Sequence, residues 1–421
     1  MNFLSTFIKR DDFTKQSLIV FTATMVVNIC NYLYQIFIGR ALGPEEFGIF
    51  GALFAIFYLT GIITSTVQSG VSYFVSRYKT ENKTNQINSF LRQLIIKSVL
   101  FGIIGFAIFV LISPFIASFL NITNISPIII VGTVFLFTFT LPVTLGGLQG
   151  LQYFKKLSLI NLATAFGKLG FGIILILAGF GIYGALGAVS LGYFLAIVFA
   201  LYTMRNFLSN KNNKNDEETY NFSEFLYYSI PLIIIIFCLN VPSNLDVIIV
   251  KHFFSDYEAG LYVSASVLGK MVLFVSSAII IVMFPKVAEL GILHQDTRPL
   301  LNRSLLYTGI LSGSVTAVFV FFPEIVCFLF GKAYIEAKTL IVIYSIMMFM
   351  LSLTTVIAQY SLAIKKLKFC IILCTFTIAE MITIWFIHGS LIGIAIILMI
   401  INSILLVISY LTVYSWRYPV E

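Results

Sequence analysis

Apolar runs of about 20 residues recur along the whole chain, and each is long enough to cross roughly 30 Å of hydrocarbon as a helix. Of the 421 residues, 59% are hydrophobic and only 10% are charged. Soluble domains carry about 25% charged residues, so this chain cannot cover a water-exposed surface of the ordinary kind. A membrane β-barrel would instead show segments of about 10 residues with alternating polarity. The sequence therefore predicts an all-α polytopic membrane protein.

Twelve membrane spans fit this pattern. They are predicted near residues 17–38, 48–72, 94–113, 128–149, 159–179, 183–204, 225–248, 258–284, 304–323, 339–361, 370–387 and 390–414. Between the sixth and seventh spans lies the polar segment N-K-N-N-K-N-D-E-E-T, which is typical of a solvated linker. We therefore predict two pseudo-symmetric bundles of six helices each. The N-terminal lobe covers residues 1–208, the cytoplasmic linker 209–224, and the C-terminal lobe 225–421.

The distribution of Lys and Arg predicts the orientation of the chain, because cytoplasmic loops carry an excess of these residues. With the N-terminus inside, 20 of the 26 basic residues fall in cytoplasmic segments and 4 fall outside. We therefore expect a multi-pass protein of the cytoplasmic membrane with both termini in the cytoplasm. The basic residues are dispersed between the spans, so the net charge of +8 does not indicate a nucleic-acid partner.

A stretch of the first half is repeated in the second. The segment from Asn28 to Phe50 has a degenerate copy 212 residues later, from Asn240 to Tyr262, in which Gly260 replaces Gly48. Because each half holds six spans, an even number, both halves enter the membrane in the same sense and form a parallel repeat. Two like bundles would leave a cleft between them, and rocking one against the other would expose that cleft to alternate sides.

The repeated segments carry polar side chains on one helix face. These are Asn28, Asn31, Tyr32 and Gln35 in the first half, and Asn240, Ser243 and Asn244 in the second. Amides that faced lipid would lack hydrogen-bond partners, so the two faces should meet the protein interior or a hydrated cavity. Contacts between the bundles would explain them. We favour a polar lining of the cleft, to which Gln68 in the second span is added.

Four ionisable residues fall within predicted spans, namely Lys168, Asp246, Lys270 and Glu380. A charge at the bilayer centre costs at least about 2.5–3.5 kcal/mol, so each should face the interior and have a partner. We expect Lys168 and Lys270, together with Arg40, to hold an anionic headgroup. Asp246 or Glu380 would then act as counter-charge or coupling group. Mutual neutralisation of the same residues is the alternative.

Nothing in the sequence is typical of an active site. The histidines His252, His294 and His388 are scattered, and no cluster of His and carboxylates has metal-ligand spacing. The five cysteines are interpreted as small apolar packing residues. We therefore predict no catalytic residues, no metal, no cofactor and no enzymatic activity.

Two stretches resemble a known family. Residues 39–50 read G-R-A-L-G-P-E-E-F-G-I-F, and residues 245–262 read L-D-V-I-I-V-K-H-F-F-S-D-Y-E-A-G-L-Y. Both are similar to signatures of the polysaccharide-biosynthesis membrane transporters. These are the O-antigen and oligosaccharide flippases of the multidrug/oligosaccharidyl-lipid/polysaccharide exporter superfamily. The likeness covers essentially the whole chain and places Asp246 at the position of a frequent acid. Compared with lipid II flippases, the chain lacks two C-terminal spans, which makes peptidoglycan precursor a less expected cargo.

The resemblance implies a V-shaped two-lobe transporter. Such a protein moves a glycan linked to polyprenyl phosphate or pyrophosphate from the inner to the outer leaflet by alternating access. Cationic residues in the cavity of these proteins meet the anionic carrier, which suits Lys168 and Lys270. The implied partners are a lipid-linked oligosaccharide, membrane lipids and glycan-assembly proteins, with H⁺ or Na⁺ as the coupling cation. The alternatives are a cation-coupled multidrug exporter of the same superfamily and a membrane-embedded glycan polymerase.

Overall fold

The computed structural model describes residues 2–209, 244–293, 295–364 and 369–415, together with residues 233, 236, 237, 241 and 366. Side chains are described from residue 18 onward, except 206–209, 285 and 292 within these ranges. Within this part of the chain the regular structure is helical and contains no strand. Ten of its helices are long and apolar enough to cross a membrane. The prediction of an all-α polytopic membrane protein is confirmed.

The chain divides into two compact units. Unit 1 comprises Met1–Ala41 and Ile56–Ile236, and unit 2 comprises Leu42–Ala55 and Phe237–Glu421. Unit 2 thus includes a short piece of the N-terminal half, whereas the predicted division places that piece in the N-terminal lobe. The predicted linker lies outside the described residues, and the predicted lobe boundaries stay a prediction.

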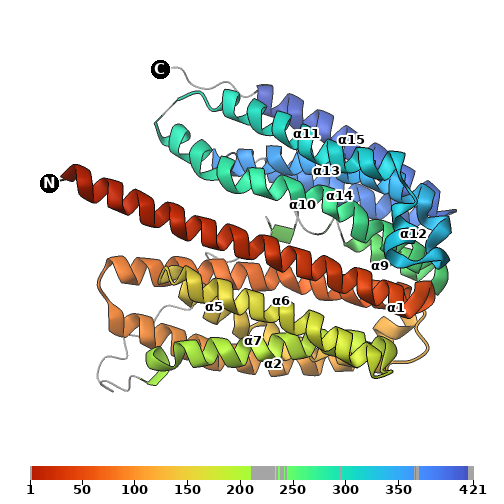
Figure 1. Ribbon diagram of the computed structural model, residues 1–421, viewed down its shortest axis with the longest axis horizontal. Helices are drawn as coiled ribbons and strands as arrows, with labels where there is room; N and C mark the ends of the chain where they lie inside the picture. Colours follow the sequence, from red (N-terminus) through yellow and green to blue (C-terminus); the bar gives the residue numbers. More distant parts are fainter. Residues whose placement is uncertain are drawn as a thin grey trace. The chain divides into compact units, whose positions relative to one another are not determined.

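Unit 1 is built from helices that run alongside one another (Figure 1). They are α1 (Asn2–Thr80) apart from its residues 42–55, α2 (Thr84–Phe119), α3 (Ser126–Gly132), α4 (Phe135–Thr138), α5 (Thr140–Gly150), α6 (Phe154–Leu177) and α7 (Gly181–Ser209). Helix α1 contains the first two predicted spans and is interrupted at Gly43, whose φ of 76° and ψ of 173° are not helical. Glycine adopts positive φ without a steric penalty, and Pro44 disfavours a helical residue before it.

Unit 2 consists of the short helix α9 (Leu245–Phe253) followed by longer helices. These are α10 (Asp256–Ile292), α11 (Arg298–Phe321), α12 (Ile325–Phe330), the 3₁₀ helix Lys332–Ala337, α13 (Lys338–Ala363), α14 (Phe369–Phe386) and α15 (Leu391–Ser415). Helix α10 begins with a capping box, in which Ser255 and Glu258 each bond the other's backbone N–H. The eleventh and twelfth predicted spans are separate helices, α14 and α15. The predicted seventh span lies mostly outside the described residues.

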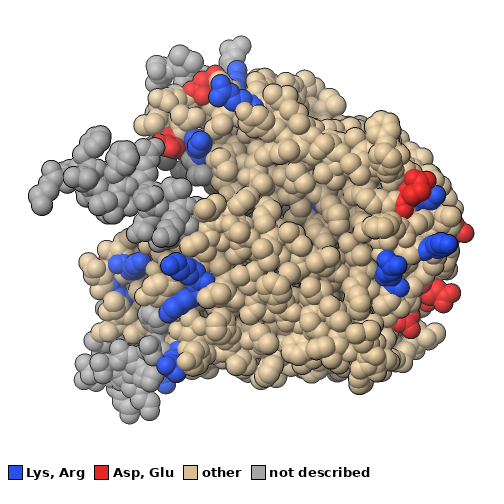
Figure 2. Space-filling view, in the orientation of Figure 1, with Lys and Arg blue, Asp and Glu red and all other residues tan. Residues whose placement is uncertain are grey.

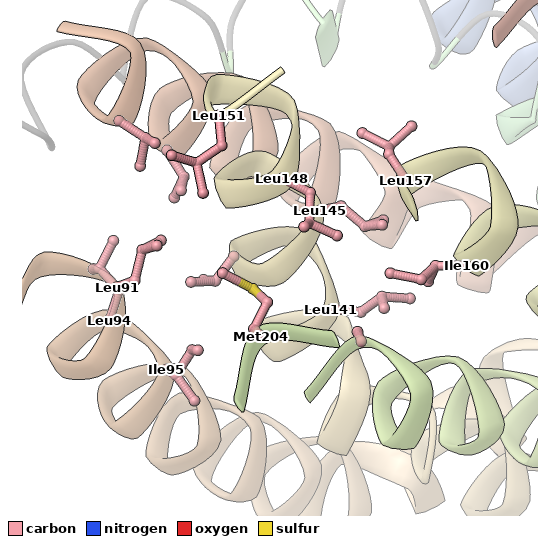
Figure 3. Close-up of a cluster of buried hydrophobic side chains, with 14 of the residues drawn as sticks. Leu91, Leu94, Ile95, Leu141, Leu145, Leu148, Leu151, Leu157, Ile160 and Met204 are labelled. Carbon is pink, nitrogen blue, oxygen red and sulfur yellow. The ribbon is translucent and has the colours of Figure 1, made fainter. Parts of the chain in front are cut away.

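Apolar side chains from five helices, α1, α2, α5, α6 and α7, form a core inside unit 1 (Figure 3). Leu91, Leu94 and Ile95 of α2 lie near α5, which contributes Leu141, Leu145 and Leu148, and Leu151 directly follows it. Leu157 and Ile160 of α6 and Met204 of α7 complete the labelled cluster. These contacts fix α6 against α5 and α7, and α6 carries the buried lysine described below.

The repeated turns contact each other within unit 2, and they do so through equivalent residues. A Cβ at Gly48 would lie 2.2 Å from the Asp256 carbonyl oxygen, and a Cβ at Gly260 would lie 1.8 Å from that of Pro44. Because 44 and 256, like 48 and 260, are 212 positions apart, the contact has a local two-fold relation. We call Pro44–Gly51 and Asp256–Val263 the turn pair. Its backbones approach closely only because both crossing residues are glycine.

Charged side chains gather at the helix ends on the visible face, and the surface between them carries other residues (Figure 2). At one such end, Glu81 lies between α1 and α2 and forms ion pairs with Arg77 and Lys83. Hydrogen bonds from Lys83 and Arg77 lower the pKa of Glu81, because they favour its charged form.

Among the cysteines, Cys374 is disulfide-bonded, so interpreting it as a packing residue is wrong.

Candidate functional site

A polar cavity of about 250 Å³ lies within unit 1, and we call it the unit 1 cavity. Three residues predicted from the sequence line it: Asn31 of α1, Gln68 of α1 and Lys168 of α6. Its other lining side chains belong to Val27, Phe57, Tyr58, Thr64, Leu141, Pro142, Leu145, Asn161, Thr164, Ala165 and Tyr193. The structure thus brings together a cation, amides and hydroxyls inside a membrane-spanning bundle.

Lys168 is the only cation among the described residues that line this cavity, and only 6% of it is exposed. Its Nζ donates a hydrogen bond to Oδ1 of Asn31 over 2.6 Å. The same Nζ lies 4.8 Å from the centroid of the Tyr34 ring, within the range of a cation–π interaction. A buried ammonium needs such partners because desolvation otherwise disfavours its charge. The predicted interior position of Lys168 is therefore what the structure shows.

Two glycines place Lys168 against its neighbours. The Tyr34 ring occupies the space beside Gly172, where a Cβ would lie 2.7 Å from a ring carbon. Gly192 of α7 approaches the backbone of Lys168, and a Cβ there would lie 2.9 Å from the Lys168 nitrogen. The Tyr34 hydroxyl also donates a hydrogen bond to the carbonyl oxygen of Ala185 in α7. Helix α6 is thereby held between α1 and α7 at the level of the lysine.

The amides around the cavity are held by partners of their own. Gln68 Nε2 donates to Oε1 of Gln149 over 2.9 Å, which joins α1 to α5. Gln35 is half-buried and hydrogen-bonds Tyr58, a lining residue. Tyr193 of α7 packs edge-on against Phe57. These contacts lie within unit 1, so both the cleft lining and the contact between bundles stay predictions.

Two other predicted residues of unit 1 lie elsewhere. Asn28 is half-buried and Arg40 is exposed, and neither lines the unit 1 cavity. In unit 2, Asn240 lies outside the described residues. The prediction that both stripes face one cleft between the halves stays a prediction. The lining residues Tyr58, Asn161 and Tyr193 were not singled out from the sequence, although a lone Asn within a span is a signal that could have been used.

Unit 2 buries a carboxyl group that two tyrosines hold. Asp246, in the first turn of α9, is 2% exposed. Its Oδ2 accepts hydrogen bonds from the hydroxyls of Tyr262, over 3.0 Å, and Tyr344, over 2.7 Å. Ser266 Oγ lies 3.0 Å from the Tyr344 hydroxyl. The second oxygen, Oδ1, is buried and has no hydrogen-bond partner among the described residues.

The other predicted charges of unit 2 lie near this carboxyl group. Lys270 of α10 donates from Nζ to Oδ1 of Asn244 over 3.3 Å and lies within electrostatic range of Asp246. Glu380 of α14 is 4% exposed and lies within electrostatic range of Asp246 as well. Asn402 Nδ2 donates to Oε1 of Glu380 over 2.6 Å. We call Asp246, Lys270 and Glu380 with these partners the unit 2 charge cluster.

This cluster has two buried acids and one lysine, and Asp246 lies within electrostatic range of Lys270. The Tyr344 and Asn402 contacts were not predicted, because they join helices far apart in the sequence. Among the described residues, no group of three or more His, Cys, Asp or Glu side chains is placed to hold a metal ion. The unit 1 cavity and the unit 2 charge cluster each hold ionisable side chains that can bind a charged group inside a helical bundle.

The fold is similar to that of several solved helical membrane proteins. An inward-facing multidrug resistance MATE family transporter of the MOP superfamily matches with a TM-score of 0.77 and 14% identity, over 94% of this chain and 96% of that one. The lipid II flippase MurJ in an inward closed conformation matches with a TM-score of 0.72 and 14% identity, over 95% and 88%. At these identities the similarity shows the fold.

The sequence comparisons place the chain more narrowly. The sequence model of the family described as polysaccharide biosynthesis protein matches residues 37–339, most of the chain. The chain belongs to this family, and the resemblance predicted from the repeated signatures is confirmed. An uncharacterized membrane protein of Methanocaldococcus jannaschii is 27% identical over 383 residues, covering 85% of this chain and 87% of that protein.

Proposed function

We propose that this protein is a flippase that moves a polyprenyl-(pyro)phosphate-linked oligosaccharide across the cytoplasmic membrane for the assembly of surface polysaccharide or glycan. The observation that carries the proposal is Lys168, a buried ammonium among amides and hydroxyls in a membrane-spanning bundle. Membership of the polysaccharide biosynthesis family and the transporter fold support the same function.

Lys168 is suited to meet the phosphate of the lipid carrier. Its Nζ already has Asn31 and the Tyr34 ring as partners, so the ammonium is positioned before cargo arrives. A cavity of about 250 Å³ accommodates a phosphate group or one sugar, but not a whole oligosaccharide. The unit 1 cavity would therefore serve as one subsite of a larger path, with Gln68 contributing an amide beside the phosphate.

The unit 2 charge cluster is suited to coupling rather than to holding the headgroup. Lys270 has Asn244 as a hydrogen-bond partner and an acid in electrostatic range, so it serves as a counter-charge. Asp246 keeps one buried oxygen without a partner in the described part of the chain, and so does Asn402. Buried oxygens of this kind attract a proton or a small cation. We propose that H⁺ or Na⁺ is exchanged here during alternating access.

A cation-coupled multidrug exporter is the second candidate, because a multidrug transporter shares the fold over most of its length. Export of organic cations calls for an acidic cavity, whereas the unit 1 cavity has a lysine and no acid among its described lining residues. A glycan polymerase would need catalytic carboxylates beside the cargo path. The lining of the unit 1 cavity therefore favours a flippase over both alternatives. The absence of enzymatic activity stays a prediction.

One pair of assays separates the candidates. The purified protein, reconstituted in liposomes, would be given a fluorescent polyprenyl-pyrophosphate-linked N-acetylglucosamine, and transfer would be followed by quenching with a membrane-impermeant reductant. The same liposomes would be loaded with ethidium. A flippase transfers the glycolipid and leaves ethidium gradients unchanged. Ethidium export without glycolipid transfer would support the multidrug exporter and contradict the proposal.

A further inference from the structure

Helix α6 borders two apolar grooves on the surface of unit 1, apart from the cavity. One groove of about 610 Å³ lies between α1 and α6, and the other, of about 890 Å³, lies between α6 and α7. We call them the α1–α6 groove and the α6–α7 groove. Both are lined by Leu159, Leu162 and Phe166. These three side chains form a shared ridge, of which Leu159 is 53% and Phe166 is 54% exposed.

The ridge differs from the face of α6 that lines the unit 1 cavity. Asn161, Thr164 and Lys168 point into the cavity, whereas Leu159 and Phe166 line the grooves. The grooves therefore form a separate surface, accessible from the lipid phase. Two apolar grooves on either side of one ridge match a lipid with two hydrocarbon chains, one chain in each groove.

One end of the α1–α6 groove is polar. Lys155 and Ser158 both line it, and residues three apart on a helix lie on the same face. Ser158 is only 3% exposed, and its Oγ has no hydrogen-bond partner among the described residues. A buried hydroxyl without a partner is costly, so it indicates an absent ligand atom. An acceptor oxygen within this groove would satisfy it.

The first turn of α6 favours an anion at the same place. No side chain caps its N–H groups, and the turn contains no acidic residue. Unpaired N–H groups and the helix dipole stabilise negative charge there. Lys155 and Lys156 are both exposed, but only Lys155 lines the groove, whereas Nζ of Lys156 lies 5.0 Å from the centroid of the Tyr153 ring. Among the described residues that line the α1–α6 groove, Lys155 is the cation.

We propose that this surface binds a two-chain anionic phospholipid of the leaflet predicted to be cytoplasmic. Its phosphate is held by Lys155, the Ser158 hydroxyl and the first turn of α6. Its two chains lie in the α1–α6 and α6–α7 grooves. Because the site lies on a different face of α6 from the unit 1 cavity, it does not depend on the proposed function. Bound lipid would brace α6, the helix that carries Lys168.

Native mass spectrometry of the full-length protein tests the site, with phosphatidylglycerol and phosphatidylcholine as probes. We expect the wild type to retain phosphatidylglycerol about tenfold more tightly than phosphatidylcholine, because the choline ammonium of phosphatidylcholine is repelled by Lys155 and offsets the attraction of its phosphate. Lys155→Gln should reduce this preference to about twofold or less, and Ser158→Ala should weaken phosphatidylglycerol binding about fivefold. The matched control Lys156→Gln should behave as the wild type.

Three results would overturn the proposal. The first is equal retention of the two phospholipids by the wild type. The second is an equal loss of the phosphatidylglycerol preference in Lys155→Gln and Lys156→Gln, which would show that general surface charge and not a specific site binds the lipid. The third is displacement of phosphatidylglycerol by an equimolar single-chain polyprenyl phosphate, which would assign the surface to the cargo lipid. Thermal unfolding of each variant in phosphatidylcholine alone checks that the variant is folded. Because Lys155 is exposed, Lys155→Gln should unfold at the wild-type temperature.

Discussion

Replacing Gly260 with alanine should disrupt the turn pair. The added Cβ would lie 1.8 Å from the carbonyl oxygen of Pro44, and real Cβ atoms essentially never approach another heavy atom closer than 3.0 Å. The two backbones must therefore separate by at least the difference of 1.2 Å. No flexible side chain can relieve this contact, because the same Cβ would also lie 2.6 Å from the carbonyl carbon and 2.9 Å from the Cα of Pro44.

The expected cost follows from this geometry. Overpacking that shifts side chains or backbone costs about 1–3 kcal/mol, and a contact between two backbones belongs at the upper end, at about 3 kcal/mol. For a unit of roughly 200 residues, about 2–4 °C is lost per kcal/mol, so the unfolding temperature should fall by about 6–12 °C. Thermal unfolding in detergent, followed through the emission of the two tryptophans, measures this shift.

A matched control is Gly309→Ala, in helix α11 of the same unit. Its Cβ would meet no atom within 4 Å, so the variant should be as stable as the wild type or about 0.5–1 kcal/mol more stable. Gly48→Ala, whose Cβ would lie 2.2 Å from the Asp256 carbonyl oxygen, should destabilise unit 2 as Gly260→Ala does. If Gly260→Ala and Gly309→Ala unfold at the same temperature, the close approach of the turn pair is wrong.

Two further predictions concern the buried charges. Tyr344→Phe removes a donor from the buried carboxyl group of Asp246 and should lower stability by about 1–3 kcal/mol, measured by thermal unfolding. An unchanged unfolding temperature would contradict the bond. Asn31→Leu removes an acceptor from the Lys168 ammonium and should lower the free energy of unfolding by about 1.5–3 kcal/mol. Lys168→Met should cost less stability in the Asn31→Leu background than in the wild type, because the hydrogen bond is already lost there. A double-mutant cycle measures that coupling, and additive effects would show that the two side chains do not interact.

The fold was predictable from the sequence because the membrane imposes a strong signal. Spans of about 20 apolar residues are required in hydrocarbon, so composition and length alone predict the helices. Helices α14 and α15 are separated by only four residues, 387–390, and were still predicted as two spans. The pairing of the turns was not predicted, although the repeat named both glycines. A repeat shows that two segments are equivalent, but it does not show that they touch.

The candidate site was predictable only in part. Lys168, Asp246 and Glu380 could be singled out because an ionisable residue within a span must be buried against partners. The partners themselves were not predictable, because Tyr344 and Asn402 belong to helices that reach these acids only through tertiary packing. The same limit applies to Arg40, which the sequence groups with the lysines and the structure leaves exposed outside the unit 1 cavity.

The most direct test of the account compares transport of a charged and a neutral lipid. Proteoliposomes would be given fluorescent polyprenyl-pyrophosphate-linked N-acetylglucosamine or the uncharged polyprenyl glycoside of the same sugar. If Lys168 holds the phosphate, only the pyrophosphate lipid should cross rapidly. Lys168→Met should then slow it about tenfold or more, the value of one charge-assisted contact. The control Lys156→Met should transport normally. Equal transport of the neutral lipid, or full transport by Lys168→Met, would contradict the central claim.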